Sequence, residues 1–120
     1  MNYDFNYALT VFVDTVMKRY ADFEGRTSRR DFWHYVSIAL LIAVGFNILS
    51  MIPYLGPIFS LVSLLVGLAL VLPGIAISIR RMHDIDQSGL MVLIPIYNIY
   101  LACQPGTTRT NRFGPEPRKL

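Results

Sequence analysis

The stretch FWHYVSIALLIAVGFNILSMIPYLGPIFSLVSLLVGLALVLPGIAISI, residues 32–79, decides the fold. It contains no Asp, Glu, Lys or Arg, so every formally charged side chain of the protein lies outside it. A soluble domain of this size would normally interrupt such a run with charged surface positions. A charge at the centre of a bilayer, in contrast, costs roughly 2.5 kcal/mol or more. The stretch therefore predicts a helical hairpin inserted in a membrane.

The composition also indicates lipid as the main solvent. Of 120 residues, 53% are hydrophobic and 16% are charged, whereas soluble domains carry about 25% charged residues. The length suits a single membrane domain over residues 1–120. The net charge is +3, and the positive residues flank the apolar stretch. This arrangement favours anionic lipid headgroups as partners and does not suggest nucleic acid.

Two spans are predicted inside the stretch, at residues 32–52 and 58–79. The first has 21 residues, which form a helix of about 31 Å, enough to cross a hydrocarbon core of roughly 30 Å. Ser28 and Asp31 match a capping box, S-x-x-[DE], just before the apolar run. This pattern places the start of the first long helix near Arg29.

A few positions inside the spans are polar, small or helix-breaking. Asn47 is expected to face the other helix, because an unpaired amide in hydrocarbon costs several kcal/mol. Ser60, Ser63 and Gly67 are expected to let the two helices approach closely. Pro73, which a glycine follows, predicts a kink or loosening near the end of the second helix.

Two further apolar segments flank the hairpin. Residues 5–20 place apolar side chains at helical spacing on one face. Such an amphipathic helix either lies in the membrane interface, which we favour, or packs on the rest of the fold. Residues 90–103 are uncharged but short, and Pro95 and Asn98 interrupt them. They predict a re-entrant or interfacial segment, with a third span as the alternative. Residues 104–120, with several prolines and glycines, form a tail without a long helix.

The positive residues predict how the chain is threaded. Five Lys and Arg precede residue 32, two follow the second span and four lie in the tail, whereas the turn PYLGP, residues 53–57, has none. The positive-inside rule therefore places the N-terminus and the segment after the second span in the cytoplasm and the turn outside. With two spans the tail is cytoplasmic, and with three it would lie outside.

Metal and disulfide sites are not expected. Cys103 is the single cysteine, so it cannot form an intramolecular disulfide or a multi-cysteine metal site. His34 and His83 are far apart in the sequence, and no glycine-rich phosphate loop or nucleophile elbow is present. No cleavable signal peptide is visible in the first 20 residues. We therefore expect no metal ion and no cofactor.

Three segments carry a family resemblance. They are FEGRTSRRDFW (23–33), RRMHDIDQSG (80–89) and PGTTRTNRFGPEP (105–117). In order and spacing they resemble a family of small bacterial inner-membrane proteins catalogued as domain of unknown function 805. The resemblance implies a multi-pass protein of the bacterial inner membrane, and it implies no reaction. The family usually has aromatic residues after the serine of the second segment, where this chain has Leu90 and Met91.

The predicted threading brings these three segments together at the cytoplasmic face. They supply ten candidate residues for binding a lipid phosphate or an acidic partner: Arg26, Arg29, Arg30, Arg80, Arg81, His83, Asp84, Ser88, Asn111 and Arg112. Guanidinium groups suit this task because they bind phosphate with bidentate geometry. In the structural alternative, Arg80 or Arg81 pairs with Asp31 or Asp84 and Asn111 caps a helix, so that these residues hold the fold together.

The sequence thus predicts an all-α integral membrane protein that acts as a non-enzymatic binding or scaffold module. The alternative is a subunit of an oligomeric channel or transporter, since two spans alone cannot enclose a pore. A homo-oligomer or a membrane-protein partner is compatible with either function. An enzyme is disfavoured, because His83 and Asp84 are adjacent and point about 100° apart on a helix.

Overall fold

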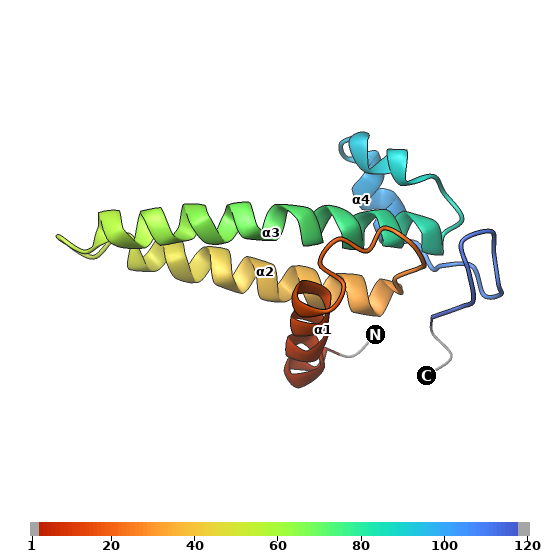
Figure 1. Ribbon diagram of the computed structural model, residues 1–120, viewed down its shortest axis with the longest axis horizontal. Coiled ribbons are helices and arrows are strands. Elements are labelled where there is room, and N and C mark those ends of the chain that lie inside the picture. Colours follow the sequence, from red (N-terminus) through yellow and green to blue (C-terminus); the bar gives the residue numbers. More distant parts are fainter. Residues whose placement is uncertain (1–2, 118–120) are drawn as a thin grey trace.

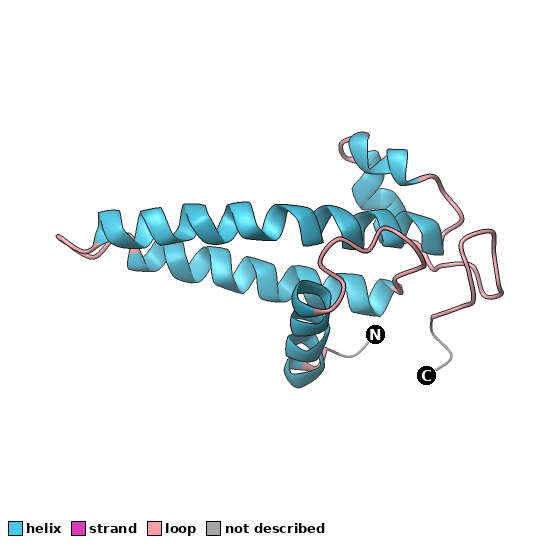
Figure 2. Cartoon of the chain, in the orientation of Figure 1, coloured by secondary structure: helices cyan, strands magenta, loops and turns pink. Residues whose placement is uncertain are grey.

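The computed structural model describes residues 3–117, which form an all-helical chain (Figures 1 and 2). Its elements are α1 (Phe5–Met17), α2 (Arg29–Leu49), α3 (Gly56–Asp84), the 3-10 helix η1 (Gly89–Leu93) and α4 (Tyr97–Ala102). Within residues 3–117 there is no strand, only an isolated bridge between Asn111 and Gly114. The predicted all-α class is confirmed. Residues 1–2 and 118–120, the last of which belong to the predicted tail, lie outside the described residues.

Helices α2 and α3 lie side by side as an antiparallel hairpin (Figure 1). The Ser28 hydroxyl accepts a hydrogen bond from the Asp31 amide at 3.1 Å, which confirms the predicted cap and the start of α2 at Arg29. Both helices are long and apolar enough to cross a membrane, yet only 17% of the most apolar 18-residue stretch of α2, and 6% of that of α3, is buried. A soluble protein would cover such a large apolar surface, so the exposure indicates lipid around the hairpin.

A tight turn closes the hairpin at the end that we call the tip. Tyr54 has a φ of 68°, in the left-handed region. At Gly56, where α3 begins, an added Cβ would lie 2.2 Å from the Ser50 carbonyl oxygen. Because no side chain fits there, this glycine allows α3 to begin two residues before the predicted span. The other end of the hairpin, where α2 begins and α3 ends, is called the base.

Helix α3 continues through Pro73 to Asp84, five residues past the predicted span. Proline has no N–H, so it leaves the carbonyl four residues earlier, that of Ala69, without its helical donor. The Tyr20 hydroxyl, just after α1, donates to this carbonyl at 2.6 Å. In lipid an unpaired carbonyl costs several kcal/mol. The tyrosine therefore satisfies the backbone group that the proline leaves open.

Helix α1 crosses the hairpin transversely near the base (Figure 1). Ala8 and Thr15 are buried against the hairpin, and the Phe12 ring stacks on Tyr35 with centroids 5.2 Å apart. A second apolar row on α1 is exposed: Phe5, Leu9, Val13 and Met17. The single apolar face predicted for residues 5–20 is therefore divided, with one part packed on the hairpin and another part open to the surroundings.

Residues 90–103 fold against the base without forming a long helix. They contain most of η1, which has five residues and begins at Gly89, and all of α4, which has six, with Pro95 between the two. Within residues 3–117 only α2 and α3 are long and apolar enough to cross a membrane, so the three-span alternative gains no support. The basal hydrophobic core is formed by Met82 of α3 with Leu101 and Ala102 of α4.

The structure corrects three of the predicted helix-packing positions. Asn47 is exposed, and one of its amide donors bonds to the Ala43 carbonyl of its own helix at 2.9 Å. Ser60 and Gly67 are also exposed, and a Cβ added at Gly67 would meet nothing within 4 Å. Ser63 is half-buried, on the same side of α3 as the half-buried Phe59.

Candidate functional site

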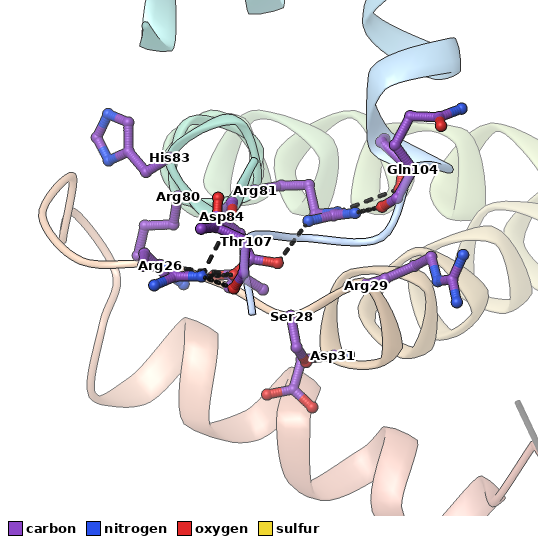
Figure 3. Close-up of polar contacts among 12 residues, drawn as sticks. Arg26, Ser28, Arg29, Asp31, Arg80, Arg81, His83, Asp84, Gln104 and Thr107 are labelled. Carbon is purple, nitrogen blue, oxygen red and sulfur yellow. Dashed lines mark hydrogen bonds and ion pairs between the residues drawn. The ribbon is translucent and has the colours of Figure 1, made fainter. Parts of the chain in front are cut away.

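A buried cluster of charged side chains occupies the base, and we call Arg26, Arg80, Arg81 and Asp84 the arginine knot (Figure 3). Their relative exposures are 5%, 1%, 0% and 0%, respectively. Charged residues are almost never this buried unless they are paired. Each of these four side chains is therefore expected to have a partner.

Asp84, in the last turn of α3, joins two arginines. Its Oδ1 lies 3.0 Å from Nη2 of Arg26, and its Oδ2 accepts from Nη1 of Arg81 at 2.8 Å. Arg81 precedes Asp84 by three positions, so the two share one helix face. Arg26 arrives from the α1–α2 connector, 58 residues away in sequence. One carboxylate thus holds the connector to the end of α3.

Backbone carbonyls of the tail take up the remaining guanidinium donors. Arg26 donates to the carbonyls of Thr107 at 2.5 Å, Arg109 at 2.7 Å and Gly114 at 3.1 Å. Arg81 donates to the carbonyl of Ala102 at 3.1 Å and to that of Gln104. Figure 3 shows Arg26 and Arg81 on the two sides of Asp84, with bonds from Arg26 to Thr107 and from Arg81 to Gln104. The tail is therefore bound into the base by side-chain-to-backbone bonds.

Arg80 turns toward the α1–α2 connector. Its Nε donates to the Thr27 hydroxyl at 3.1 Å and its Nη1 to the Asp22 carbonyl at 2.5 Å, while the Thr27 amide donates to the Arg80 carbonyl at 3.0 Å. Although burial opposes it, hydrogen bonds from Arg19 and from the Glu24 amide hold the pKa of Asp22 below its usual value. Asp22 therefore stays ionised, and its pairing with Arg19 helps fix the connector.

Within residues 3–117 every buried side-chain nitrogen or oxygen has a hydrogen-bond partner. A buried ion pair stabilises a fold only when its remaining donors are satisfied in this way. The geometry thus matches the structural alternative for Arg26, Arg80, Arg81 and Asp84. The predicted contact of these arginines with a headgroup would require opening the knot.

Four other candidates also make internal contacts. The Asn111 amide donates to the His83 carbonyl at 3.0 Å, so it caps the end of α3 as the structural alternative expected. The His83 ring stacks on Phe113 with centroids 3.9 Å apart. Exposed Arg112 pairs with Asp86 at 3.1 Å, and Ser88 caps η1. His83 contacts the Gly25 carbonyl through Nδ1, whereas Asp84 contacts Arg26 and Arg81.

Arg29 and Arg30 differ from the knot, because they lie in the first turn of α2 with their heads near the surface. Arg29 is half-buried and points away from the knot (Figure 3). Its Nη1 donates to the Cys103 carbonyl at 3.1 Å. Arg30 is exposed, and its guanidinium lies 3.8 Å from the centroid of the Tyr7 ring. Guanidinium edges thus remain available at the border of the apolar surface.

Sequence reasoning missed several residues that position the base. The Tyr7 hydroxyl of α1 donates to Asp31, and burial, followed by this hydrogen bond, raises the pKa of Tyr7 to about 12. The phenol therefore stays protonated and remains a donor. Trp33 donates its indole N–H to the Ala102 carbonyl at 3.1 Å. The position of Trp33 at the charged end of the first predicted span is typical of a membrane-interface residue, but the sequence does not indicate the polar partners of Trp33 or Tyr7.

Comparison with known proteins places these segments in a family. The family described as "Protein of unknown function (DUF805)" matches residues 20–115. The Escherichia coli K12 inner membrane protein YhaI is 33% identical over 111 residues, covering 87% of this chain and 92% of YhaI. The inner membrane protein YhaH of the same strain is 32% identical over 114 residues, covering 86% and 93%, respectively. No solved structure gives a significant match.

Proposed function

Since the chain belongs to the DUF805 family, whose matched relatives are inner membrane proteins, we propose that it is a non-enzymatic binding module of the bacterial inner membrane. Its ligands are anionic lipid headgroups, and Arg29 and Arg30 are the residues that contact their phosphates. This narrows the ten candidates to the two arginines in the first turn of α2.

The observation that carries the proposal is the division of the arginines into two groups. Arg26, Arg80 and Arg81 are buried and bonded to Asp84, to Thr27 and to carbonyls. Arg29 and Arg30 lie at the start of an apolar helix with guanidinium edges open to the surroundings. Basic residues at this boundary gain about 1 kcal/mol each from an anionic leaflet. The knot supplies the rigid base that holds them there.

In the proposed threading the base faces the cytoplasm and the tip lies on the other side. The described chain ends both lie near the base (Figure 1), as expected if α2 and α3 are the two crossings. The exposed apolar row of α1 then lies along the inner surface of the membrane, where an amphipathic helix is stable. Reporter fusions at Met1 and Leu120 should both report the cytoplasm.

The headgroup test compares two charge-matched variants. The double variant Arg29→Gln/Arg30→Gln removes the proposed contacts, and the control removes two exposed tail charges with Arg109→Gln/Arg112→Gln. Each detergent-purified protein is heated with added phosphatidylglycerol or phosphatidylcholine. We expect phosphatidylglycerol to raise the Tm of the wild type and of the control. The Tm of Arg29→Gln/Arg30→Gln should rise much less. Equal stabilisation of both variants would refute the assignment.

The structure offers little to the channel alternative. The spans 32–52 and 58–79 contain no Asp, Glu, Lys or Arg, the side chains that usually mark an ion path, and the exposed Asn47 amide donates to the Ala43 carbonyl of its own helix. The enzyme alternative would need His83 and Asp84 to work together, whereas His83 contacts the Gly25 carbonyl and Asp84 pairs with Arg26 and Arg81. Among residues 3–117 no group of three or more His, Cys, Asp or Glu is arranged to hold a metal ion.

A further inference from the structure

An apolar groove opens between the hairpin and residues 90–103, and its volume is about 440 Å³. Phe32, Trp33 and Val36 of α2 form one wall, and Met82 of α3 and Val92 of η1 lie opposite. This volume falls in the range of roughly 300–1,000 Å³ that is typical of small-molecule sites. The groove lies on the side of the base where Arg29 projects, because Arg29 precedes Phe32 and Trp33 by one helical turn.

The polar groups of the groove are already occupied by internal hydrogen bonds. The Ser78 hydroxyl donates to the Gly74 carbonyl at 2.8 Å, and the Asn98 amide donates to the Val92 carbonyl at 2.8 Å. The Trp33 indole donates to the Ala102 carbonyl. What remains for a ligand is mainly hydrocarbon and ring surface. A hydrogen-bonding ligand would find few partners here, whereas an alkyl chain would find many contacts.

The mouth of the groove has the opposite character. Arg29 donates one bond, from Nη1 to the Cys103 carbonyl, and Cys103 follows Ala102 of the groove wall. Its Nε and Nη2 make no hydrogen bond within residues 3–117. A guanidinium with free donors above an apolar groove complements an amphiphile whose anionic head and alkyl chain are joined. Anionic phospholipids have this structure, and in a bilayer they surround the protein.

We propose that this groove holds one acyl chain of a phospholipid whose phosphate contacts Arg29. The inference rests on the proposed headgroup function of Arg29 and adds a specific binding place for the chain. One lipid would then be retained as part of the protein, unlike the exchanging lipids around α2 and α3. This lipid fills the space between the hairpin and residues 90–103, so it also stabilises that segment.

The single tryptophan of the protein, Trp33, provides the probe, because it lines the groove. The purified full-length protein in a detergent micelle is titrated with phosphatidylglycerol or phosphatidylcholine brominated in the middle of the acyl chains. Bromine quenches tryptophan fluorescence at short range. We expect quenching that saturates near one lipid per protein, with phosphatidylglycerol binding more tightly than phosphatidylcholine.

Filling the groove should weaken binding at this site. The variant Val36→Phe/Val92→Phe adds bulk to two walls, and the control Val44→Phe/Val71→Phe makes the same changes at exposed positions of α2 and α3 outside the groove. We expect the groove variant to bind about tenfold more weakly, a change of about 1.4 kcal/mol, and the control to bind as the wild type does. If the double groove variant is not monodisperse, Val36→Phe and Val44→Phe are compared alone.

The outcomes separate the groove from the headgroup contact. Quenching that rises without saturation, or that is equal in the groove and control variants, overturns the groove assignment whatever the headgroup preference. Saturable quenching lost only in the groove variant, but equal for the two lipids, supports the groove and refutes the headgroup function of Arg29. Loss in the groove variant together with a phosphatidylglycerol preference supports both.

Discussion

The tip half of the hairpin exposes large apolar side chains, whereas the base buries charged ones. Toward the tip, large apolar residues such as Leu41, Ile48 and Leu65 are exposed. At the base, Arg81 and Asp84 are completely buried. A soluble protein shows the reverse of both. The comparison teaches that lipid contacts stabilise the tip half of the hairpin. The base, in contrast, folds by the rules of a protein interior, in which every charge needs a partner.

The largest effect is expected from breaking the knot. Asp84→Asn removes the charge that both Arg26 and Arg81 contact. Breaking a buried ion pair by neutralising one partner costs about 3–5 kcal/mol. We expect a loss of this order in the free energy of unfolding, measured by chemical unfolding in a detergent micelle. Asp86→Asn is the control, because its pair with Arg112 is exposed and surface pairs contribute about 0–1 kcal/mol. Equal losses in the two variants would contradict the structural role of the knot.

A charge placed on the hairpin should have the next largest effect. Leu65→Asp introduces a carboxylate at an exposed position inside α3. We expect insertion to become less favourable by about 2.5–3.5 kcal/mol, because the charge enters hydrocarbon. The measurement is the partition of the cell-free synthesised full-length protein between lipid vesicles and the soluble fraction. Thr108→Asp, at an exposed tail position, should partition as the wild type does. An unchanged partition for Leu65→Asp would show that lipid does not surround this helix.

A smaller effect is expected where the two regions meet. Tyr20→Phe removes the hydroxyl that donates to the Ala69 carbonyl. We expect the free energy of unfolding in the micelle to fall by about 1 kcal/mol, as is typical for a hydrogen bond in a membrane protein. In a Pro73→Ala background the helix has its own N–H for Ala69, so the same tyrosine substitution should cost almost nothing. A double-mutant cycle without coupling would disprove this relation.

The elements that follow from local sequence were predictable. The run 32–79 indicated two long apolar helices because exclusion of charge over that length has few explanations other than lipid. The Ser28–Asp31 cap was predictable because it depends on residues three positions apart. The pairing of Arg81 with Asp84 was one of several pairings left open, and the same three-residue spacing now explains it.

The distant contacts were not predictable from one sequence. Nothing local indicates that Arg26 reaches Asp84 or that tail carbonyls complete its bonds, since the partners are separated by 58 to 88 residues. Asn47 was misjudged because an amide can bond within its own helix as well as across to another. The division of the α1 face was not predictable either, because periodicity identifies the apolar residues but not which of them the hairpin covers.

The bonds of the tail to the knot have a consequence for how the protein is made. Carbonyl oxygens between residues 102 and 114 complete the hydrogen bonding of Arg26 and Arg81, and ribosomes synthesise them after α2 and α3. Until they emerge, these guanidinium groups must keep their water, because dehydrating a charge before its partners arrive costs several kcal/mol. In the proposed threading, hydration keeps the base on the side of synthesis while the hairpin inserts, and the arrival of residues 102–114 then locks this orientation.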